Sequence, residues 1–322
     1  MRAMIYRAYG GPEQLEMTDL PRPSPGPGQV LVQALASSVN PVDWKIASGK
    51  LRFIMPIKLP AVPGFDVAGT IAELGADVKG YAVGDLVHAR IATNSGTGAC
   101  AEFAVVGADV LNRVPARMAP AEAAALPLAG MTALQALRDH AGLPLEVARE
   151  RVLVVGASGG VGHFAVQIAR AAGATVVGVC SARNAELVAS LGAHEVIDYT
   201  KPDPYRGLAP FDIVLDCVGG SPFSWTRLLN RGGRFASIMP GPGVFIRSVL
   251  NPVTRRKVRA MLLKSNATDL SILDQLVEAG KLRVVIDSRY PLTDLRAAWK
   301  RSMSGRTVGK IVIDVPDPEN RQ

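Results

Sequence analysis

The sequence of 322 residues has few cysteines and histidines and no long apolar run, which excludes several classes of protein. Three cysteines cannot form a disulfide framework, and Cys180 and Cys217 lie in apolar stretches where a reduced, buried thiol is expected. No apolar run reaches the ~20 residues that span a bilayer. Met1–Tyr6 is not followed by the apolar segment of a signal peptide. These absences favour a cytoplasmic protein without a membrane-spanning helix.

The charge of the chain is positive, with a net value of +8 at pH 7. The densest basic cluster is Arg255-Arg-Lys-Val-Arg259, which is short and has no aromatic residues for base stacking. We interpret it as a solvated helix face and rank a nucleic-acid-binding surface behind that. We therefore expect neither a nucleic acid nor a membrane as partner.

Two kinds of pattern divide the chain. Residues 1–121 contain short β-rich runs separated by Gly and Pro turns, which predicts an antiparallel, barrel-like domain. From 122 to 283, apolar strands alternate with helical patterns, including one at Leu270–Ala279, which predicts a doubly wound parallel sheet. Residues 284–322 return to β character and are expected to rejoin the first domain. The predicted fold class is α/β with a second, β-rich domain.

A glycine-rich turn is the strongest functional signal. The segment Arg151-Val-Leu-Val-Val-Gly-Ala-Ser-Gly-Gly-Val-Gly162 runs from a strand through the turn into a helix, as in a dinucleotide-binding βαβ unit. Gly159 and Gly162 fit the second and third glycines of G-x-G-x-x-G, but Ala157 replaces the first. The alternative is a purely structural turn. Backbone amides expected to bind a pyrophosphate are those of Ser158, Gly159, Gly160, Val161 and Gly162.

The end of the next strand, Thr175–Cys180, favours NADPH as the cofactor. NAD-binding proteins usually carry a carboxylate there for the ribose 2′-hydroxyl, whereas this sequence continues Cys180-Ser-Ala-Arg-Asn184. Ser181 and Arg183 suit a 2′-phosphate, because Arg offers phosphate a rigid fork of donors. The alternative is that Ser181 caps the next helix and Arg183 is solvated.

Several further segments occur in a characteristic order along nearly the whole chain. With the glycine turn, they are Ser38-Val-Asn-Pro-Val-Asp-Trp-Lys45, Val62-Pro-Gly-Phe-Asp-Val-Ala-Gly69, Val83-Gly-Asp85, Ala124-Ala-Leu-Pro-Leu-Ala-Gly-Met-Thr-Ala133, Gly192-Ala-His-Glu-Val-Ile-Asp-Tyr199, Asp216-Cys-Val-Gly219 and Gly309-Lys-Ile-Val312. In these segments the chain resembles the zinc-independent quinone oxidoreductase branch of the medium-chain dehydrogenase/reductase superfamily. The resemblance implies a Rossmann domain at 122–283, a GroES-like catalytic domain at 1–121 and 284–322, and a cleft between them.

The zinc-dependent alcohol dehydrogenases of the same superfamily are the main rival. Their catalytic zinc needs a thiolate and an imidazole. Where the cysteine would lie, this chain has Ser38-Val-Asn40, and where Gly-His-Glu would lie it has Gly64-Phe65-Asp66. Only Cys100 falls near the expected structural zinc lobe, and the four histidines show no ligand spacing. We expect no metal site.

The resemblance assigns roles to single residues of the β-rich domain. Asn40 would contact cofactor or substrate, with an Asx-turn before Pro41 as the alternative. Lys45 replaces a tyrosine that related reductases often carry; it would donate to the substrate oxygen, or be solvated. Asp43 is expected to cap or pair locally. Lys310 would close over the cofactor, or end its strand in solvent.

Further roles follow for the Rossmann domain. Thr132 would approach the nicotinamide carboxamide, or cap a helix. Tyr199 would join Ser181 and Arg183 around the 2′-phosphorylated ribose, or pack half-buried. Val218 and Gly219 would lie beside the cofactor at the carboxyl edge of the sheet. The segment Met239–Ile246 is interpreted as a lid or substrate-facing loop.

The predicted function is a zinc-free, NADPH-dependent hydride transfer to a small quinone or α,β-unsaturated carbonyl. Such acceptors need no Lewis acid, because hydride reaches a carbon conjugated to the oxygen that takes the charge. One alternative is an enoyl or alkenal reductase for a lipid or polyketide intermediate. Another is a catalytically silent NADPH-binding redox sensor. The resemblance is compatible with a homodimer, and no residue stands out as a dedicated proton donor.

Overall fold

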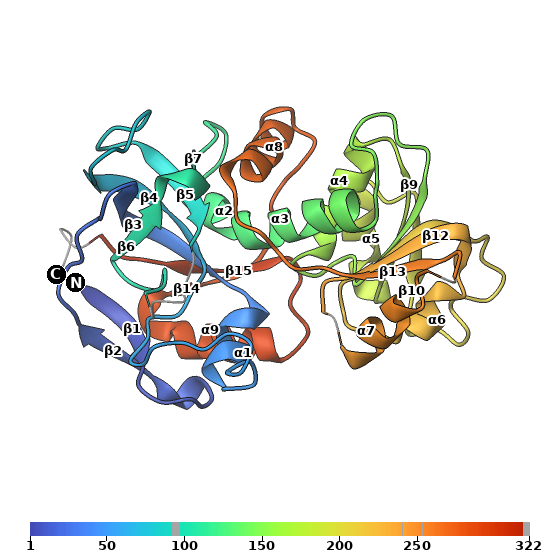
Figure 1. Ribbon diagram of the computed structural model, residues 1–322, viewed down its shortest axis with the longest axis horizontal. Helices are drawn as coiled ribbons and strands as arrows, with labels where there is room; N and C mark the ends of the chain where they lie inside the picture. Colours follow the sequence, from blue (N-terminus) through green and yellow to red (C-terminus); the bar gives the residue numbers. More distant parts are fainter. Residues whose placement is uncertain (92–96, 240, 253, 318–322) are drawn as a thin grey trace. The chain divides into compact units, whose positions relative to one another are not determined.

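The computed structural model describes residues 1–91, 97–239, 241–252 and 254–317, which form two compact units (Figure 1). The first unit comprises Met1–Leu128, Ser265–Glu278 and Val284–Gln322, and the second comprises Ala129–Lys264 and Ala279–Arg283. The chain first passes from one unit to the other within α3 (Pro127–Gln135). We describe each unit separately.

The first unit is built on β structure. Two strands, β1 (Arg2–Tyr6) and β2 (Leu15–Asp19), pair with each other, and a seven-stranded sheet has the order β14-β15-β3-β4-β5-β7, with β6 paired to β3. All pairs are antiparallel except β14 with β15. The strands of this sheet are β3 (Gln29–Val39), β4 (Asp66–Leu74), β5 (Leu86–Arg90), β6 (Phe103–Gly107), β7 (Leu111–Arg113), β14 (Ile286–Pro291) and β15 (Lys310–Asp314).

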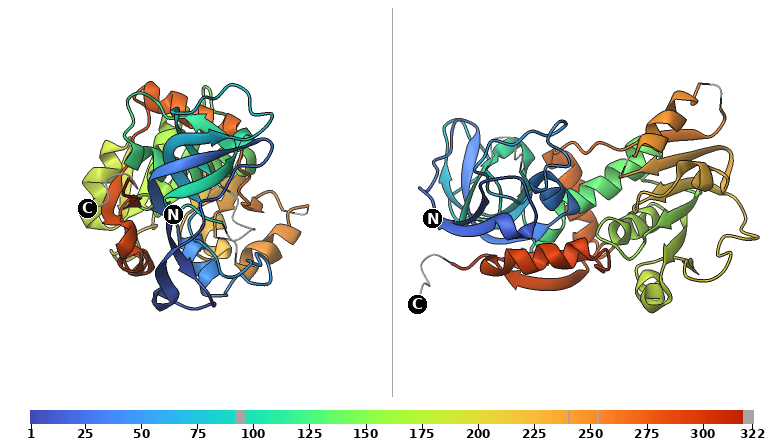
Figure 2. Two further views of the ribbon diagram at one scale, coloured as in Figure 1. Left: turned by 90° about the vertical axis from the view of Figure 1, so that its left-hand side faces the viewer. Right: turned by 90° about the horizontal axis from the view of Figure 1, so that it is seen from below.

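Short helices and the last strands complete this unit. β15 pairs antiparallel with β3, with Ile311 opposite Val39. The right-hand view of Figure 2 shows these red C-terminal elements against the blue N-terminal strands. Trp299 of α9 is fully buried in the same apolar core as Val30 and Val32 of β3. The helices are α1 (Pro41–Ala47), α2 (Pro120–Ala125), α8 (Ala267–Glu278) and α9 (Leu295–Met303), with 3-10 turns at Pro12–Gln14, Ala108–Val110 and Leu292–Asp294.

The second unit is a six-stranded parallel sheet of order β10-β9-β8-β11-β12-β13. Its strands are β8 (Arg151–Val155), β9 (Thr175–Cys180), β10 (Glu195–Asp198), β11 (Phe211–Asp216), β12 (Leu229–Ser237) and β13 (Lys257–Ala260). The order reverses between β8 and β11, as in a doubly wound sheet. The predicted fold class, a Rossmann sheet with a β-rich domain, is therefore confirmed.

Helices cover both faces of this sheet, so β8 and β11 are almost entirely buried. Figure 1 shows α4 on one side of the strands and α6 and α7 on the other. The helices are α4 (Gly162–Ala171), α5 (Ala185–Ser190), α6 (Pro222–Thr226) and α7 (Pro242–Val249), with a π-helical turn at Ala136–His140 and a 3-10 turn at Ala182–Asn184. No helix in the described part of the chain is long and apolar enough to cross a membrane.

Helix α8 belongs to the first unit, although its sequence position lies in the range 122–283 expected for the Rossmann domain. Its Asp274 lies 3.1 Å from Nε2 of the buried His88 on β5 and accepts a hydrogen bond from Asn112 of β7 at 3.0 Å. These polar contacts attach α8 to the antiparallel sheet, and no local sequence pattern predicts such long-range contacts.

The basic cluster at residues 255–259 was wrongly interpreted as a helix face, because Lys257–Ala260 forms the edge strand β13. The ammonium of Lys257 donates to the backbone carbonyls of Asn251 and Thr254 and so is used locally. In the segment expected to form a lid, Pro240 lies outside the described residues and Pro242 begins α7.

Candidate functional site

The glycine turn lies directly after β8, where the strand order of the second unit reverses, and it leads into α4. Gly156 has a φ of +77°, which L side chains rarely adopt. A Cβ on Gly162 would lie 2.1 Å from the carbonyl oxygen of Gly156, so both positions require glycine. The tight turn is therefore made by Gly156, one residue before the Ala157 expected from the motif. Amides at the start of α4 can bind an anion, helped by the helix dipole.

The turn after β9 is tied to the glycine turn. Asn184 Nδ2 donates to Ser158 Oγ at 2.9 Å, so the two loops form one continuous rim. Ser181 is half-buried and Arg183 is exposed on this rim. Tyr199 is 57% exposed at the end of the neighbouring β10, and its backbone N–H donates to the carbonyl of Cys180 at 3.2 Å.

One carboxylate, that of Asp198, does lie beside this rim on β10. Its Oδ1 accepts hydrogen bonds from the N–H and the hydroxyl of Thr200, at 3.0 and 2.8 Å. These bonds lower the pKa of Asp198, so the carboxylate stays ionised and engaged with its own loop.

The end of β11 supplies a feature whose role the sequence did not reveal. Asp216 is fully buried, and its Oδ1 accepts the N–H groups of Val218 and Gly219, each at 3.0 Å. Burial raises the pKa of Asp216. This carboxylate shapes the loop so that Val218, 55% exposed, faces the glycine turn: a Cβ on Gly156 would lie 2.6 Å from Val218 Cγ1. The only available signal was a carboxylate ending an apolar strand three residues before a glycine.

The structure thus joins most of the predicted nucleotide-binding residues within the second unit. Ser158–Gly162, Ser181, Arg183, Tyr199 and Val218 all lie at the carboxyl ends of β8, β9, β10 and β11. Thr132 lies elsewhere in that unit, on α3, and is 6% exposed. The rim, the Gly156–Gly162 cradle and the α4 start fit a dinucleotide, because ligands bind such sheets at the strand order reversal.

In the first unit, a buried carboxylate gathers polar groups from β3, β4 and α3. Asp66, which begins β4, is fully buried. Its Oδ2 accepts hydrogen bonds from Ser38 Oγ at 2.7 Å and from Asn40 Nδ2 at 2.8 Å. Its Oδ1 accepts the backbone N–H of Leu128 at 2.9 Å. A buried carboxylate needs such partners, and here both oxygens have them.

Lys310 completes this arrangement, which we call the buried cluster (Ser38, Asn40, Asp66 and Lys310). Lys310 is 3% exposed, and its Nζ donates to Asn40 Oδ1 at 2.5 Å and to the Val39 carbonyl at 3.4 Å. The same Nζ lies 3.7 Å from Asp66 Oδ2. Burial lowers the pKa of Lys310, and the Asp66 carboxylate opposes that change. The amide of Asn40, itself 2% exposed, therefore links the buried anion to the buried cation.

The buried cluster occupies the positions where the zinc-dependent branch would carry its cysteine and its Gly-His-Glu. Its groups are a hydroxyl, an amide, a carboxylate and an ammonium, whereas protein zinc sites use thiolates and imidazoles. The ammonium already balances Asp66, so this donor set does not fit a zinc ion. Among the residues the structure describes, no three His, Cys, Asp or Glu side chains are placed to hold a metal.

Two further residues of the Ser38–Lys45 segment lie on α1. Asp43 is buried and its Oδ2 accepts the backbone N–H of Asn40 at 2.6 Å, which caps the helix. Lys45 is half-buried, with its Nζ 5.5 Å from the centre of the Trp44 ring. Burial and the neighbouring Lys50 lower the pKa of Lys45.

Comparison with known proteins agrees with this architecture. Residues 26–116 match the family described as alcohol dehydrogenase GroES-like domain, and residues 191–313 match the one described as zinc-binding dehydrogenase. The chain is 41% identical, over 98% of each sequence, to the chloroplast envelope quinone oxidoreductase homolog of Arabidopsis thaliana. It is 32% identical to the mitochondrial NAD(P)H oxidoreductase RTN4IP1 of Mus musculus, over 90% of this chain and 82% of that protein.

A solved structure gives the same result. The quinone oxidoreductase of Coxiella burnetii superposes with a TM-score of 0.88 at 30% identity, covering 98% of this chain and 99% of that one. The predicted resemblance is thereby confirmed, and with it an enzyme that uses a nicotinamide cofactor and a small-molecule substrate. The chain belongs to the quinone oxidoreductase branch of the medium-chain dehydrogenase/reductase superfamily.

Proposed function

We propose that this protein is an NADPH-dependent, zinc-free reductase of quinones or α,β-unsaturated carbonyl compounds. The observation that carries the cofactor choice is the rim of the second unit, where Asn184 ties the Ser181–Arg183 turn to the glycine turn. This rim offers a hydroxyl and a guanidinium, and the neighbouring Asp198 is bound by Thr200. A 2′-phosphate is favoured by such donors.

Each part of the site has a proposed task. The amides of Ser158–Gly162 hold the pyrophosphate, and Ser181, Arg183 and Tyr199 hold the phosphorylated ribose. Thr132 and Val218 orient the nicotinamide end, which supplies a hydride when the cofactor is bound. In the first unit, Asn40, Lys45 and Lys310 provide positive charge and hydrogen-bond donors for the oxygen that becomes negative during reduction.

The substrate class rests on the names of similar proteins and on this chemistry. A quinone or an enone accepts hydride at a carbon conjugated to its oxygen, so a hydrogen-bond donor or cation suffices in place of a metal. We further propose a reducing compartment such as the cytoplasm, because Cys100, Cys180 and Cys217 are all free thiols. Gel filtration at assay concentration tests the expected homodimer.

Arg183→Asp is expected to reverse the cofactor preference. It replaces a donor to the 2′-phosphate by a carboxylate, so we expect the KM for NADPH to rise by about 10- to 100-fold while the KM for NADH changes little. Steady-state kinetics with both cofactors measure this. Arg231→Asp, an exposed change on β12, is the matched charge control. A wild-type enzyme that prefers NADH would contradict the proposed role of the Ser181–Arg183 turn.

Treatment with a chelator is expected to leave the activity unchanged, since the buried cluster has no ligand set for zinc. The measurement is NADPH oxidation against a panel of quinones and enones, before and after dialysis with the chelator. The best acceptor separates quinone from alkenal or enoyl reduction. A lasting loss of turnover that zinc restores would refute the zinc-free mechanism. Tight NADPH binding with no turnover on any acceptor would favour the redox sensor instead.

A further inference from the structure

Asp43 has a buried oxygen without a partner. The side chain is 4% exposed, and while its Oδ2 accepts the Asn40 N–H, its Oδ1 has no hydrogen-bond partner among the described residues. An ionised carboxylate left in this state is costly. A protonated carboxyl group removes the charge and turns the unpartnered oxygen into a hydroxyl that can donate.

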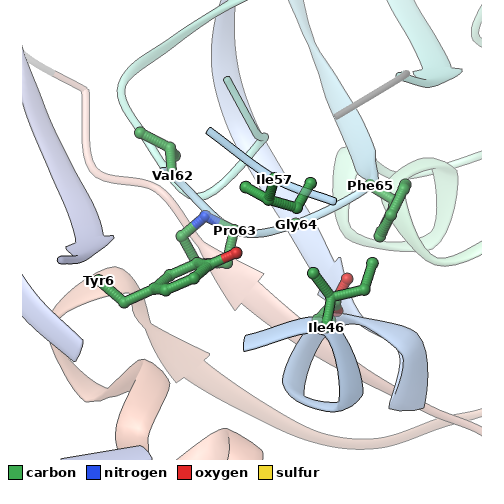
Figure 3. Close-up of a pocket in the computed structure, with 8 residues that line it drawn as sticks. Tyr6, Ile46, Ile57, Val62, Pro63, Gly64 and Phe65 are labelled. Atoms are coloured by element: carbon green, nitrogen blue, oxygen red, sulfur yellow. The ribbon is translucent and has the colours of Figure 1, made fainter. Parts of the chain in front are cut away.

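The unpartnered oxygen belongs to a residue that lines a small pocket in the first unit. Figure 3 shows Tyr6 and Ile46 opposite Pro63 and Gly64 in this pocket, and Asp43, Ile57, Val62 and Phe65 complete its wall. The cavity volume is about 10 Å³, enough for about one water molecule. The pocket is therefore far too small for a quinone or an enone, but it can hold a water that accepts a hydrogen bond from Asp43.

The charges around Asp43 come from three strands. Asp66 on β4 repels a negative charge at this position, whereas Lys310 on β15 and Arg90 on β5 attract one. Desolvation is the largest of these effects, followed by the hydrogen bond from Asn40, and together they raise the pKa of Asp43 to about 8.

Two other titratable groups face Asp43. Tyr6 and Cys100 both feel its charge, and burial raises the pKa of each. Both are therefore neutral at physiological pH. With Asp43 protonated, the two charged groups of the buried cluster, Asp66 and Lys310, balance each other.

We propose that Asp43 is a neutral carboxylic acid that stores the proton consumed by the reduction and returns it to Lys310. This inference rests on the proposed function. Reduction adds one hydride, which the bound cofactor supplies, and one proton. Lys310 loses a proton from Nζ as the substrate oxygen gains it, and the O–H bond of Asp43 then breaks as the N–H bond of Lys310 is restored. Solvent returns a proton to Asp43, which acts through Lys310 and is thus a positioning residue.

The first experiment measures proton storage without any catalysis. It compares the free energies of unfolding of wild type and Asp43→Asn between pH 4 and pH 8. In the unfolded chain Asp43 releases its proton near pH 3.8, whereas in the folded chain it keeps the proton up to about pH 8. The wild type should therefore lose stability relative to Asp43→Asn throughout this range. A difference that does not change with pH would overturn the proposal.

Asp85→Asn is the matched control. Hydrogen bonds from the Ala82 N–H and from Arg113 lower the pKa of Asp85. Its contribution is lost only as the pH falls through and below 3.8, so the difference from wild type should be flat between pH 4 and pH 8. If Asp43→Asn fails to fold, Asp43→Ser replaces it in the same comparison.

The second experiment is a pH–rate profile with saturating NADPH. We expect the wild-type kcat to fall above about pH 8, and Asp43→Asn to lose this fall together with at least about 10-fold in kcat. The dissociation constant for NADPH should be unchanged. An unaltered profile in Asp43→Asn would show that the stored proton is not used. A wild type without any reductase activity would refute the proposed function alone, since the unfolding experiment would still report the proton.

Discussion

Lys310→Met is expected to lower the free energy of unfolding by about 3–5 kcal/mol, the usual result of removing one partner of a buried ion pair. The Lys310 ammonium is the cation nearest to Asp66 in the buried cluster, at 3.7 Å, and methionine leaves that carboxylate without it. We also expect kcat/KM to fall by about 100-fold, because a donor to the developing oxyanion is lost. Urea denaturation and steady-state kinetics measure the two effects.

A double variant separates the two roles of Lys310. Asp66→Asn combined with Lys310→Met removes both charges, and replacing a buried pair by neutral groups is often harmless to stability. We expect the double variant to regain most of the lost free energy of unfolding but none of the lost activity. Recovery of activity along with stability would mean that Lys310 only neutralises Asp66 and takes no part in the reduction.

Gly162→Ala is expected to abolish measurable NADPH binding, with an increase in the dissociation constant of at least about 100-fold. The added methyl carbon would lie 2.1 Å from Gly156 O, 2.8 Å from Gly156 C and 2.9 Å from Ala157 Cα, all backbone atoms. The start of α4 must therefore move away from the turn, which misplaces the amides that bind the pyrophosphate. We expect a loss of about 1–3 kcal/mol in unfolding free energy as well.

Gly159→Ala provides the comparison. A Cβ at this position has only one neighbour within 4 Å, Gly156 O at 3.3 Å, so the fold should accept it with little loss of stability. Its effect should appear in binding alone, because the methyl group would point toward the space left for the phosphates. Titration of NADPH with each variant, alongside urea denaturation, distinguishes the two cases. Equal losses of stability would contradict the assigned geometry of the turn.

Local patterns were sufficient to predict the Rossmann unit and the nucleotide rim. A strand, a glycine turn and a helix are contiguous in the sequence, and their order specifies where a pyrophosphate binds. Even here the tight turn is made by Gly156 rather than at Ala157, and Arg255–Arg259 lies partly on an edge strand. Charged side chains on an exposed edge obscure the alternation by which a strand is recognised.

The buried cluster could not be derived in this way. Lys310 and Asn40 lie 270 positions apart in the sequence and meet only because β15 pairs with β3 in one particular register. A shift of one residue would place Lys310 on the opposite face of the sheet. The sequence did indicate that Asp43 acts locally, but its unpartnered oxygen and the adjacent pocket depend on the packing of β1 against residues 62–65.

The pairing of β15 with β3 also has a consequence for biosynthesis. Domains generally fold as units while the ribosome is still adding residues. Nearly all of the second unit, residues 129–264, has been synthesised before Lys310 emerges, whereas β3 and Asp66 emerge long before their cation. A nascent chain halted short of residue 310 should therefore carry a folded nucleotide half and an acid still awaiting its counterion. Translation itself thus sets the order in which the two halves of this enzyme become competent.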